Sequence, residues 1–156
     1  NHPGICVGYK LITDEGTVAY FPDNEPHSSS HHSGKPQSAD NEAARAFAEQ
    51  QERLTAQFLN GTDVLVLDSQ YDDEEYKSHL GWGHGCVSYA VSLALRAKVK
   101  KLFLFHHDPD HDDAKLDRML ADARRLVAAA ASLMQVEAAR EGTVVELAKV
   151  SRGGAP

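Results

Sequence analysis

Short apolar runs alternate along the chain with turn residues and amphipathic stretches. Residues 5–12 and 17–21 are β-rich and flank the turn residues 13–16, a pattern that predicts a hairpin. Two later runs, residues 64–67 and 102–105, are short and wholly apolar, which is typical of strands buried on both faces of a sheet. The chain therefore has at least two kinds of predicted strand, a solvated pair and a buried pair.

Helical periodicity fills the intervals between these runs. Apolar residues recur at near-helical spacing in residues 41–60, including Phe47 and Phe58, and charged residues fill the other face. Residues 86–97 and 114–131 carry similar apolar stripes. Alternating strands and helices predict an α/β domain.

The remaining segments are harder to assign from pattern. Residues 27–40 are rich in Ser, His, Gly and Pro and are expected to form a flexible insertion. Residues 133–138 fit either an extension of the preceding helix or a strand, and residues 143–147 form a further β-rich run. We expect one domain over residues 1–147, followed by a frayed tail at 148–156.

Composition narrows the class of protein. A length of 156 residues suits one domain with a real core. The formal net charge of −7 argues against a broad surface for binding DNA phosphates, but it is compatible with a metal site, because bound cations offset local negative charge.

Cysteine use and hydropathy indicate a cytoplasmic protein without a membrane segment. Cys6 and Cys86 form neither a disulfide framework nor zinc-finger spacing, so reduced thiols are expected. The chain has no apolar run near the length of a membrane span and no signal peptide. It begins at Asn1 and leads almost directly into an apolar run, so we expect it to be a piece of something longer.

A dense polar cluster follows the apolar run at residues 102–105. Three histidines and four carboxylates stand within eight residues: His106, His107, Asp108, Asp110, His111, Asp112 and Asp113. Imidazole and carboxylate groups are ligands for zinc, iron or manganese. The simpler interpretation is a solvated acidic turn, with Asp112 and Asp113 capping the next helix.

Other candidate groups also stand at the ends of apolar runs. Asp23, Asp68 and His106 each follow a predicted strand, His84 is at the centre of a glycine-rich turn, and His2 precedes the first strand. Strand ends on one edge of a sheet lie close in space, so these residues are able to converge. Two histidines and a carboxylate would supply part of a metal ligand set. A further histidine such as His84 could protonate a leaving group, with Asp68 fixing its tautomer.

Structural interpretations compete with several of these assignments. Asp23 is also a normal turn or cap residue, and residues 81–85 also fit a plain strand-to-helix turn. Trp82 is expected to pack against its neighbours and not to stack on a substrate. The four acids at 72–75 are interpreted as the start of a short helix. His27, next to a strand end, stays a candidate.

Four short motifs occur in a familiar order: Asn1-His2-Pro3-Gly4, Tyr20-Phe-Pro-Asp23, Gly83-His84-Gly85 and Leu104-Phe105-His106. Together they resemble the C-terminal half of a metallo-β-lactamase-fold hydrolase, closest to the phosphodiesterase and ribonuclease Z branch. The resemblance covers residues 1 to about 147. It implies an αββα sandwich of which this chain holds one sheet with its flanking helices.

The resemblance also implies roles for individual residues. His2 would be a terminal metal ligand, Asp23 would bridge two metals, and His106 would be the last ligand. His84 would be the catalytic or phosphate-contacting histidine, with Asp68 as its partner. Four further residues are assigned to the surroundings of the metal or the substrate rim: His27, His107, Asp108 and His111.

The implied activity is hydrolysis of a phosphodiester or similar ester by hydroxide activated at two divalent ions. Zinc is the expected metal, with manganese or iron as alternatives. The alternatives for function are hydrolysis of a lactam, lactone or thioester in the same fold, or a metal-free binding module.

One expected motif is missing. The related enzymes carry a His-x-His-x-Asp-His motif in an N-terminal half, and this sequence has none. We therefore expect that the missing half or a complementing chain completes the protein, that apolar surface is exposed without it, and that this chain alone is inactive. A homo-oligomer is a further possibility.

Overall fold

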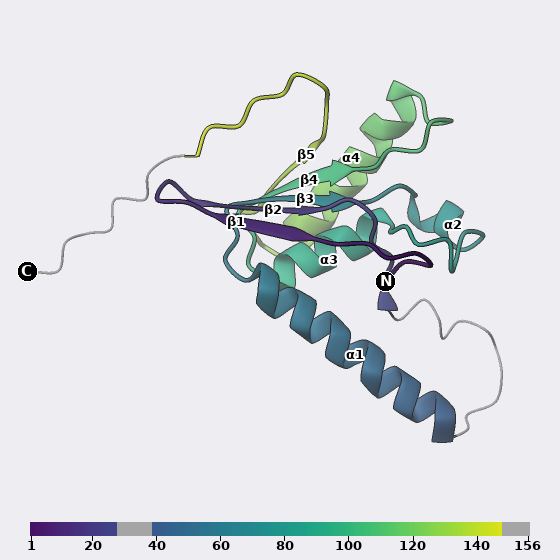
Figure 1. Cartoon of the computed structure of the whole chain (residues 1–156). Helices are drawn as coiled ribbons and strands as arrows, with labels where there is room; N and C mark the ends of the chain where they lie inside the picture. The colour runs from purple at the N-terminus through teal and green to yellow at the C-terminus, as the bar shows by residue number, and fades with distance from the viewer. Residues whose placement is uncertain (28–38, 148–156) are drawn as a thin grey trace, which may run out of the picture.

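The computed structural model describes residues 1–27 and 39–147. Within them the chain forms one five-stranded sheet in the order β1-β2-β3-β4-β5 (Figure 1). The strands are β1 (Tyr9–Ile12), β2 (Thr17–Phe21), β3 (Val64–Asp68), β4 (Lys101–Phe105) and β5 (Gln135–Ala138). β1 pairs antiparallel with β2, whereas β2 to β5 are all parallel. The predicted hairpin and buried strands are confirmed, and residues 133–138 contribute a strand.

The helices connect the parallel strands. They are α1 (Ala39–Leu59), α2 (Asp73–Tyr76), α3 (Val87–Arg96) and α4 (Asp113–Ala129). An aspartate caps the N-terminus of α2 and another caps α4, as predicted from the acidic residues at 72–75 and 112–113. Asp72 caps α2 in a reciprocal capping box with Glu75, and the Asp112 side chain accepts from the Lys115 backbone N–H at 2.7 Å to cap α4.

The core lies between one face of the sheet and helices α3 and α4. Leu65 and Leu67 of β3 and Leu102 and Leu104 of β4 point into it, and each is at most 2% exposed. Successive strand residues face opposite sides, so the residues between these leucines line the other face. Each such leucine contributes about 1.5–3 kcal/mol by its burial.

The second face of the sheet is apolar and only partly covered. Val18, Val66 and Phe103 line a groove of about 300 Å³, together with residues of the segment 139–147. No helix within residues 1–27 and 39–147 covers this face (Figure 1). Phe103 is only 4% exposed in this groove, whereas Tyr9 and Leu11 of β1, which pair with Tyr20 and Val18, are each 58% exposed. The expected exposure of apolar surface is therefore observed at the β1 side of this face.

The prediction of a β-rich run at residues 143–147 is wrong, because this segment is irregular. It lies over the second face of the sheet, beside Val18, Val66 and Phe103, and not along the edge of β5 where its backbone groups could pair. The predicted tail at 148–156 and most of the predicted insertion at 27–40 lie outside the described residues.

Helix α1 begins at Ala39 and differs from its predicted packing. Phe47 is 58% exposed and Leu54 is 48% exposed, whereas Ala48 and Leu59 are buried. The physical reason at Phe47 is position: α1 packs against α3, and its N-terminal part extends away from the sheet (Figure 1). Lys10 of β1 stabilises the other end, because its Nζ donates to the carbonyl of Phe58 at 2.9 Å.

Candidate functional site

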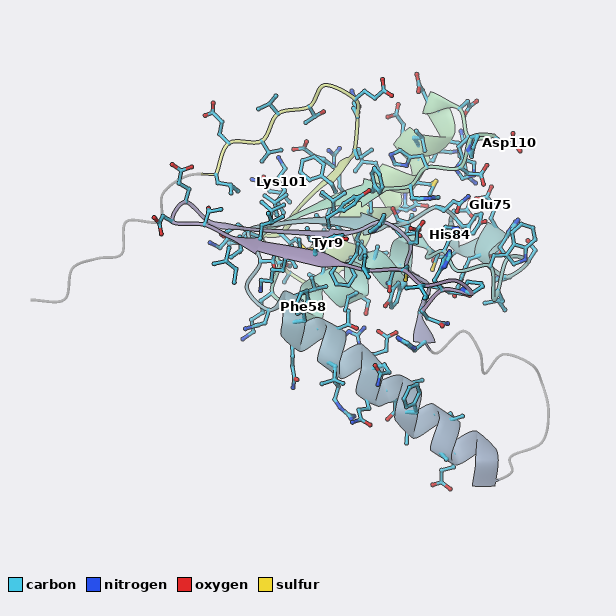
Figure 2. The ribbon with its side chains drawn as sticks, viewed as in Figure 1. Tyr9, Phe58, Glu75, His84, Lys101 and Asp110 are labelled. Atoms are coloured by element: carbon cyan, nitrogen blue, oxygen red, sulfur yellow. The ribbon has the colours of Figure 1, made fainter. Side chains whose placement is uncertain are left out.

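The carboxyl edge of the sheet gathers the predicted site residues. Asp23, Asp68 and His106 follow or end β2, β3 and β4, which run parallel and so finish at one edge. β1 runs the opposite way, so the segment before it, with His2, starts at this same edge. His84 reaches the edge from the turn before α3 (Figure 2). The predicted convergence is therefore observed.

Three imidazoles and one carboxylate are in close contact there. The Nε2 of His106 lies 3.3 Å from Oδ1 of Asp23. The described residues form two groups of possible metal ligands, in each of which the ligand atoms lie within 4.8 Å of one another. One group is His2, Asp23 and His84, and the other is Asp68, His84 and His106. The rings of His84 and His106 stack with centroids 4.5 Å apart, and His2 meets His84 edge-on at 5.6 Å.

This set of donors fits a divalent cation such as zinc. Imidazole nitrogen and carboxylate oxygen at mutual distances below 4.8 Å are the ligand types and spacing that such an ion needs. The Nδ1 of His106 is buried without a hydrogen-bond partner among the described residues. His106 also has a φ of +63°, a backbone conformation that residues other than glycine rarely adopt and that is associated with functional positions.

Asp68 fixes the orientation of His84. Asp68 is fully buried, and its Oδ2 lies 2.7 Å from Nδ1 of His84. Its two oxygens also accept from three backbone N–H groups, those of Asn24, Gln70 and Gly85. Burial raises the pKa of Asp68, and the hydrogen bonds from His84 and from the backbone oppose that rise. With its proton on Nδ1, His84 keeps Nε2 for chemistry.

The glycine turn before α3 passes very close to His2. Gly83 has a φ of +96°, and a Cβ atom there would lie 2.4 Å from Cδ2 of His2 and 2.6 Å from Cδ of Pro3. Only glycine allows this approach. Gly81, in the same turn, has a φ of +84° but no atom within 4 Å of the equivalent position. The sequence pattern of three glycines therefore has a steric cause at Gly83.

Sequence reasoning missed Glu25. Its side chain is 1% exposed, and its two oxygens accept from the backbone N–H groups of Gly81 and Gly83 at 2.7 and 2.9 Å. The only available signal was an acid two residues after Asp23, in a segment that otherwise looks like a turn. The contact joins residues 56 and 58 positions apart, which no local pattern reveals.

The other candidates lie outside the two groups of possible metal ligands that the described residues form. The backbone N–H of His27 donates to Glu52 at 3.0 Å, and its ring meets Phe47 edge-on with centroids 6.4 Å apart. Burial lowers the pKa of His27. The structure thus places His27 beside α1, and a role in the site stays a prediction.

His107, Asp108 and His111 contact neighbouring loops. The Nε2 of His107 lies 3.2 Å from the carbonyl of Ala139, and burial lowers the pKa of this histidine. Asp108 accepts from Nε2 of Gln70 at 2.9 Å, and the backbone N–H of Asp110 is the main cause of its lowered pKa. His111 pairs with Glu75 at 3.1 Å. These contacts hold the loops around the site together, and a part in binding substrate stays a prediction.

The expected packing of Trp82 is limited to one edge contact. The indole is 61% exposed and meets the ring of His79 at 4.7 Å. Trp82 is therefore more exposed than the expected packing implies.

The fold of the chain is a metallo-β-lactamase fold. The structure of the metallo-β-lactamase fold protein YhfI from Bacillus subtilis matches 93% of this chain with a TM-score of 0.62 and 18% sequence identity. The match covers 46% of YhfI. The chain therefore has the fold of about half of such a protein, as the sequence motifs predicted.

The similarity in sequence is to ribonuclease Z. The chain is 37% identical over 59 residues to ribonuclease Z of Picrophilus torridus, over 38% of this chain and 19% of the relative. It is 38% identical over 68 residues to the ribonuclease Z proteins of Sulfurisphaera tokodaii and Saccharolobus solfataricus, over 44% of this chain and 22% of each relative. These matches thus span about a fifth of the relatives' length.

No protein-family model matches the chain. Among the described residues, no helix is both long enough and apolar enough to cross a membrane.

Proposed function

We propose that this chain forms one side of the active site of a metal-dependent hydrolase that cleaves phosphodiesters or similar esters. The observation that carries the proposal is the grouping of His2, Asp23 and His106 around His84, with His84 held by the buried Asp68. Metal ligands and an oriented histidine at the same edge of a sheet would together supply an activated water and a proton donor for ester hydrolysis.

The comparisons support the general class. Metallo-β-lactamase-fold similarity and partial identity to proteins named ribonuclease Z favour a family of metal-dependent hydrolases and nucleases. The name ribonuclease Z implies a phosphodiester substrate for those relatives. We extend that substrate class to this chain, because His84 is suited to protonate an alcohol leaving group.

His2 and Asp23, which belong to one group of possible ligands, and His106, whose Nε2 lies 3.3 Å from Asp23, would hold the metal. Two zinc ions are the proposed content, with manganese or iron as alternatives. Bound metal would supply an activated water and would polarise the ester oxygen. The residues of this chain have a separate task. His84 would present its Nε2 to the leaving oxygen, while Asp68 would keep the proton on Nδ1 and stabilise the imidazolium.

We further propose that an N-terminal half of this fold, or a complementing chain, covers the second face of the sheet and supplies the remaining metal ligands. The apolar groove beside Val18 and Val66, together with the exposed Tyr9, Leu11 and Tyr20 at the β1 side, supports this proposal, because a large exposed apolar surface is unfavourable in water. The 46% coverage of YhfI supports it as well. A second copy of this chain is the homo-oligomeric version of the same idea.

The proposal is tested on the complete protein by elemental analysis and by a panel of bis(p-nitrophenyl) phosphate, a lactam and a thioester. We expect about two metal ions per protein, the usual content of a two-metal hydrolytic site, and hydrolysis of the phosphodiester. The 156-residue chain alone is expected to show negligible activity with added zinc or manganese. Preference for the lactam or thioester would overturn the proposed substrate class. Absence of metal and of all three activities would favour a binding module.

A further inference from the structure

Glu25 is a buried carboxylate whose contacts converge on one turn. Its Oε1 accepts from the N–H of Gly81 at 2.7 Å and from the hydroxyl of Tyr76 at 3.1 Å, and its Oε2 accepts from the N–H of Gly83 at 2.9 Å. A carboxylate that is 1% exposed is stable only when donors satisfy both oxygens. Here two of the three donors belong to the turn that leads directly to His84.

The backbone around Glu25 reaches the other parts of the site. The N–H of Glu25 donates to the carbonyl of Asn1 at 2.8 Å, next to His2. The N–H of Asn24 donates to Asp68 at 3.1 Å, and the Asp23 side chain lies 3.3 Å from His106. Three consecutive residues therefore contact three parts of the site. Asp23 contacts His106, Asn24 contacts Asp68, and Glu25 contacts the turn that leads to His84.

The turn depends on these bonds for its shape. Residues 81–83 belong to neither a helix nor a strand, and Gly81 and Gly83 both have positive φ, so no regular backbone ladder fixes them. Glu25 ties both glycines to the strand end that carries Asp23. A shift of the turn would move His84 relative to Asp23 and His106, because His84 follows Gly83 directly.

Another buried carboxylate shows what a purely structural role looks like. Glu52 is 7% exposed, accepts from the backbone N–H of His27 at 3.0 Å and pairs with Arg96 at 3.1 Å. Glu52 lies on α1, and among the described residues it forms no hydrogen bond or ion pair with the turn at 81–85. Glu52 is therefore the matched control for the loss of a buried carboxylate.

We propose that Glu25 is a positioning residue for the reaction: by clamping Gly81 and Gly83 it holds His84 where its Nε2 reaches the leaving oxygen. The inference rests on the proposed hydrolase function. In that reaction the oxygen of water bonds to phosphorus and the bond from phosphorus to the leaving oxygen breaks. The leaving oxygen keeps the electron pair and takes the Nε2 proton of His84. The attacking water releases one proton to solvent, and His84 takes one proton from solvent to regain the proton that it gave to the leaving oxygen.

The decisive comparison uses two phosphodiesters that differ in leaving group, assayed with the complete protein. An alcohol must be protonated as it leaves, whereas p-nitrophenolate leaves without a proton. In Glu25→Gln an amide N–H₂ replaces one acceptor, so one glycine N–H loses its partner. We expect kcat for the alcohol ester to fall by about tenfold or more, part of the 10²–10⁴ that general acid catalysis contributes. The kcat for the p-nitrophenyl ester and the metal content should remain close to their wild-type values.

Two further measurements separate positioning from general damage. Glu25→Gln should add little to His84→Ala, because both changes act on the same proton transfer. The amide resonances of Gly81 and Gly83 should move in Glu25→Gln but not in Glu52→Gln, a readout that needs no activity. Where Glu25→Gln folds poorly, Glu25→Asp keeps the charge, shortens the reach and should show the same leaving-group dependence.

Several outcomes would overturn the inference. One is an equal loss on both esters, and another is a full additional loss in the His84→Ala background. A third is a Glu52→Gln variant with the same dependence on leaving group. A wild-type protein that hydrolyses neither ester would instead sink the proposed function, while the glycine amide shifts would still report whether the clamp exists.

Discussion

The Nδ1 of His84 lies 2.7 Å from Oδ2 of Asp68, a carboxylate with no exposed surface. The two residues come from the turn before α3 and from the end of β3, 16 positions apart. Because three backbone N–H groups also bond to Asp68, the carboxylate is fixed in place and orients the imidazole. Because Nδ1 of His84 is bonded to Asp68, Nε2 is the ring nitrogen that is available for proton transfer.

Replacement of Asp68 should therefore impair activity more than binding. In Asp68→Asn the amide N–H₂ faces Nδ1, which favours the wrong tautomer of His84. We expect kcat of the complete protein to fall on the order of 10²–10⁴, the range of general acid catalysis, with a smaller change in KM. Steady-state kinetics on an alcohol ester would test this. Wild-type kcat in a folded Asp68→Asn protein would show that the pair is only structural.

The choice of His106 over His107 as the metal ligand is directly testable. His106→Ala should remove a ligand and weaken metal binding by more than about 100-fold. Mutation of a residue that only hydrogen-bonds to a metal ligand already lowers metal affinity by about 10–100-fold. His107→Ala is the matched control, because its Nε2 contacts the carbonyl of Ala139. Metal content after dialysis against a weak chelator distinguishes the two. Loss of metal in His107→Ala with retention in His106→Ala would reverse the assignment.

The two positive-φ glycines of the turn provide a steric test. Gly81→Ala and Gly83→Ala introduce similar backbone strain of about 1–2 kcal/mol, but only the second places a Cβ 2.4 Å from His2. We expect Gly83→Ala to lose metal affinity and activity, and Gly81→Ala to lose only stability. Thermal unfolding and metal titration of both variants would measure the difference. Equal metal affinity in both would mean that the turn relaxes away from His2.

The opposite edge of the sheet should control acid stability. Asp63 pairs with Lys100 at 2.6 Å and accepts from the N–H and hydroxyl of Thr17 at 2.8 and 2.9 Å. The bond from Lys100 is the main cause that lowers the pKa of Asp63 below its ordinary value. A lowered folded pKa stabilises the protein above the unfolded carboxyl pKa, and that stabilisation is lost as pH falls through the folded value.

Asp63→Asn should therefore flatten the acid side of a plot of Tm against pH without altering metal content. The variant should lose about 1–3 kcal/mol near neutral pH, because the partly buried donors of Thr17 lose a charged acceptor and Lys100 loses its ion pair. Differential scanning calorimetry from neutral pH to below the ordinary carboxyl pKa of about 4 would measure both effects. An unchanged slope in Asp63→Asn would assign the acid dependence to other carboxylates.

The sequence by itself determined most of the elements and the general place of the site. The apolar runs at 64–67 and 102–105 are predicted as buried strands because they are too short for typical helices. Amphipathic periodicity predicts helices, because apolar residues three or four positions apart lie on one helix face. Parallel strands finish at one edge, so Asp23, Asp68 and His106 were predictable neighbours. The local acids of Asp72 and Asp112 were predictable caps.

Only the tertiary structure decided which polar groups contact one another. Glu25 lies two residues from Asp23, yet its partners are Gly81 and Gly83, and contacts over such separations leave no periodic signal. Exposure was equally undetermined. Phe47 carries a core-like pattern but remains 58% exposed, because burial depends on which surface covers a residue and not on the residue's own spacing. Of the seven polar residues after β4, the fold brings His106 alone into the groups of possible metal ligands, since it directly follows the strand and its ring stacks on His84.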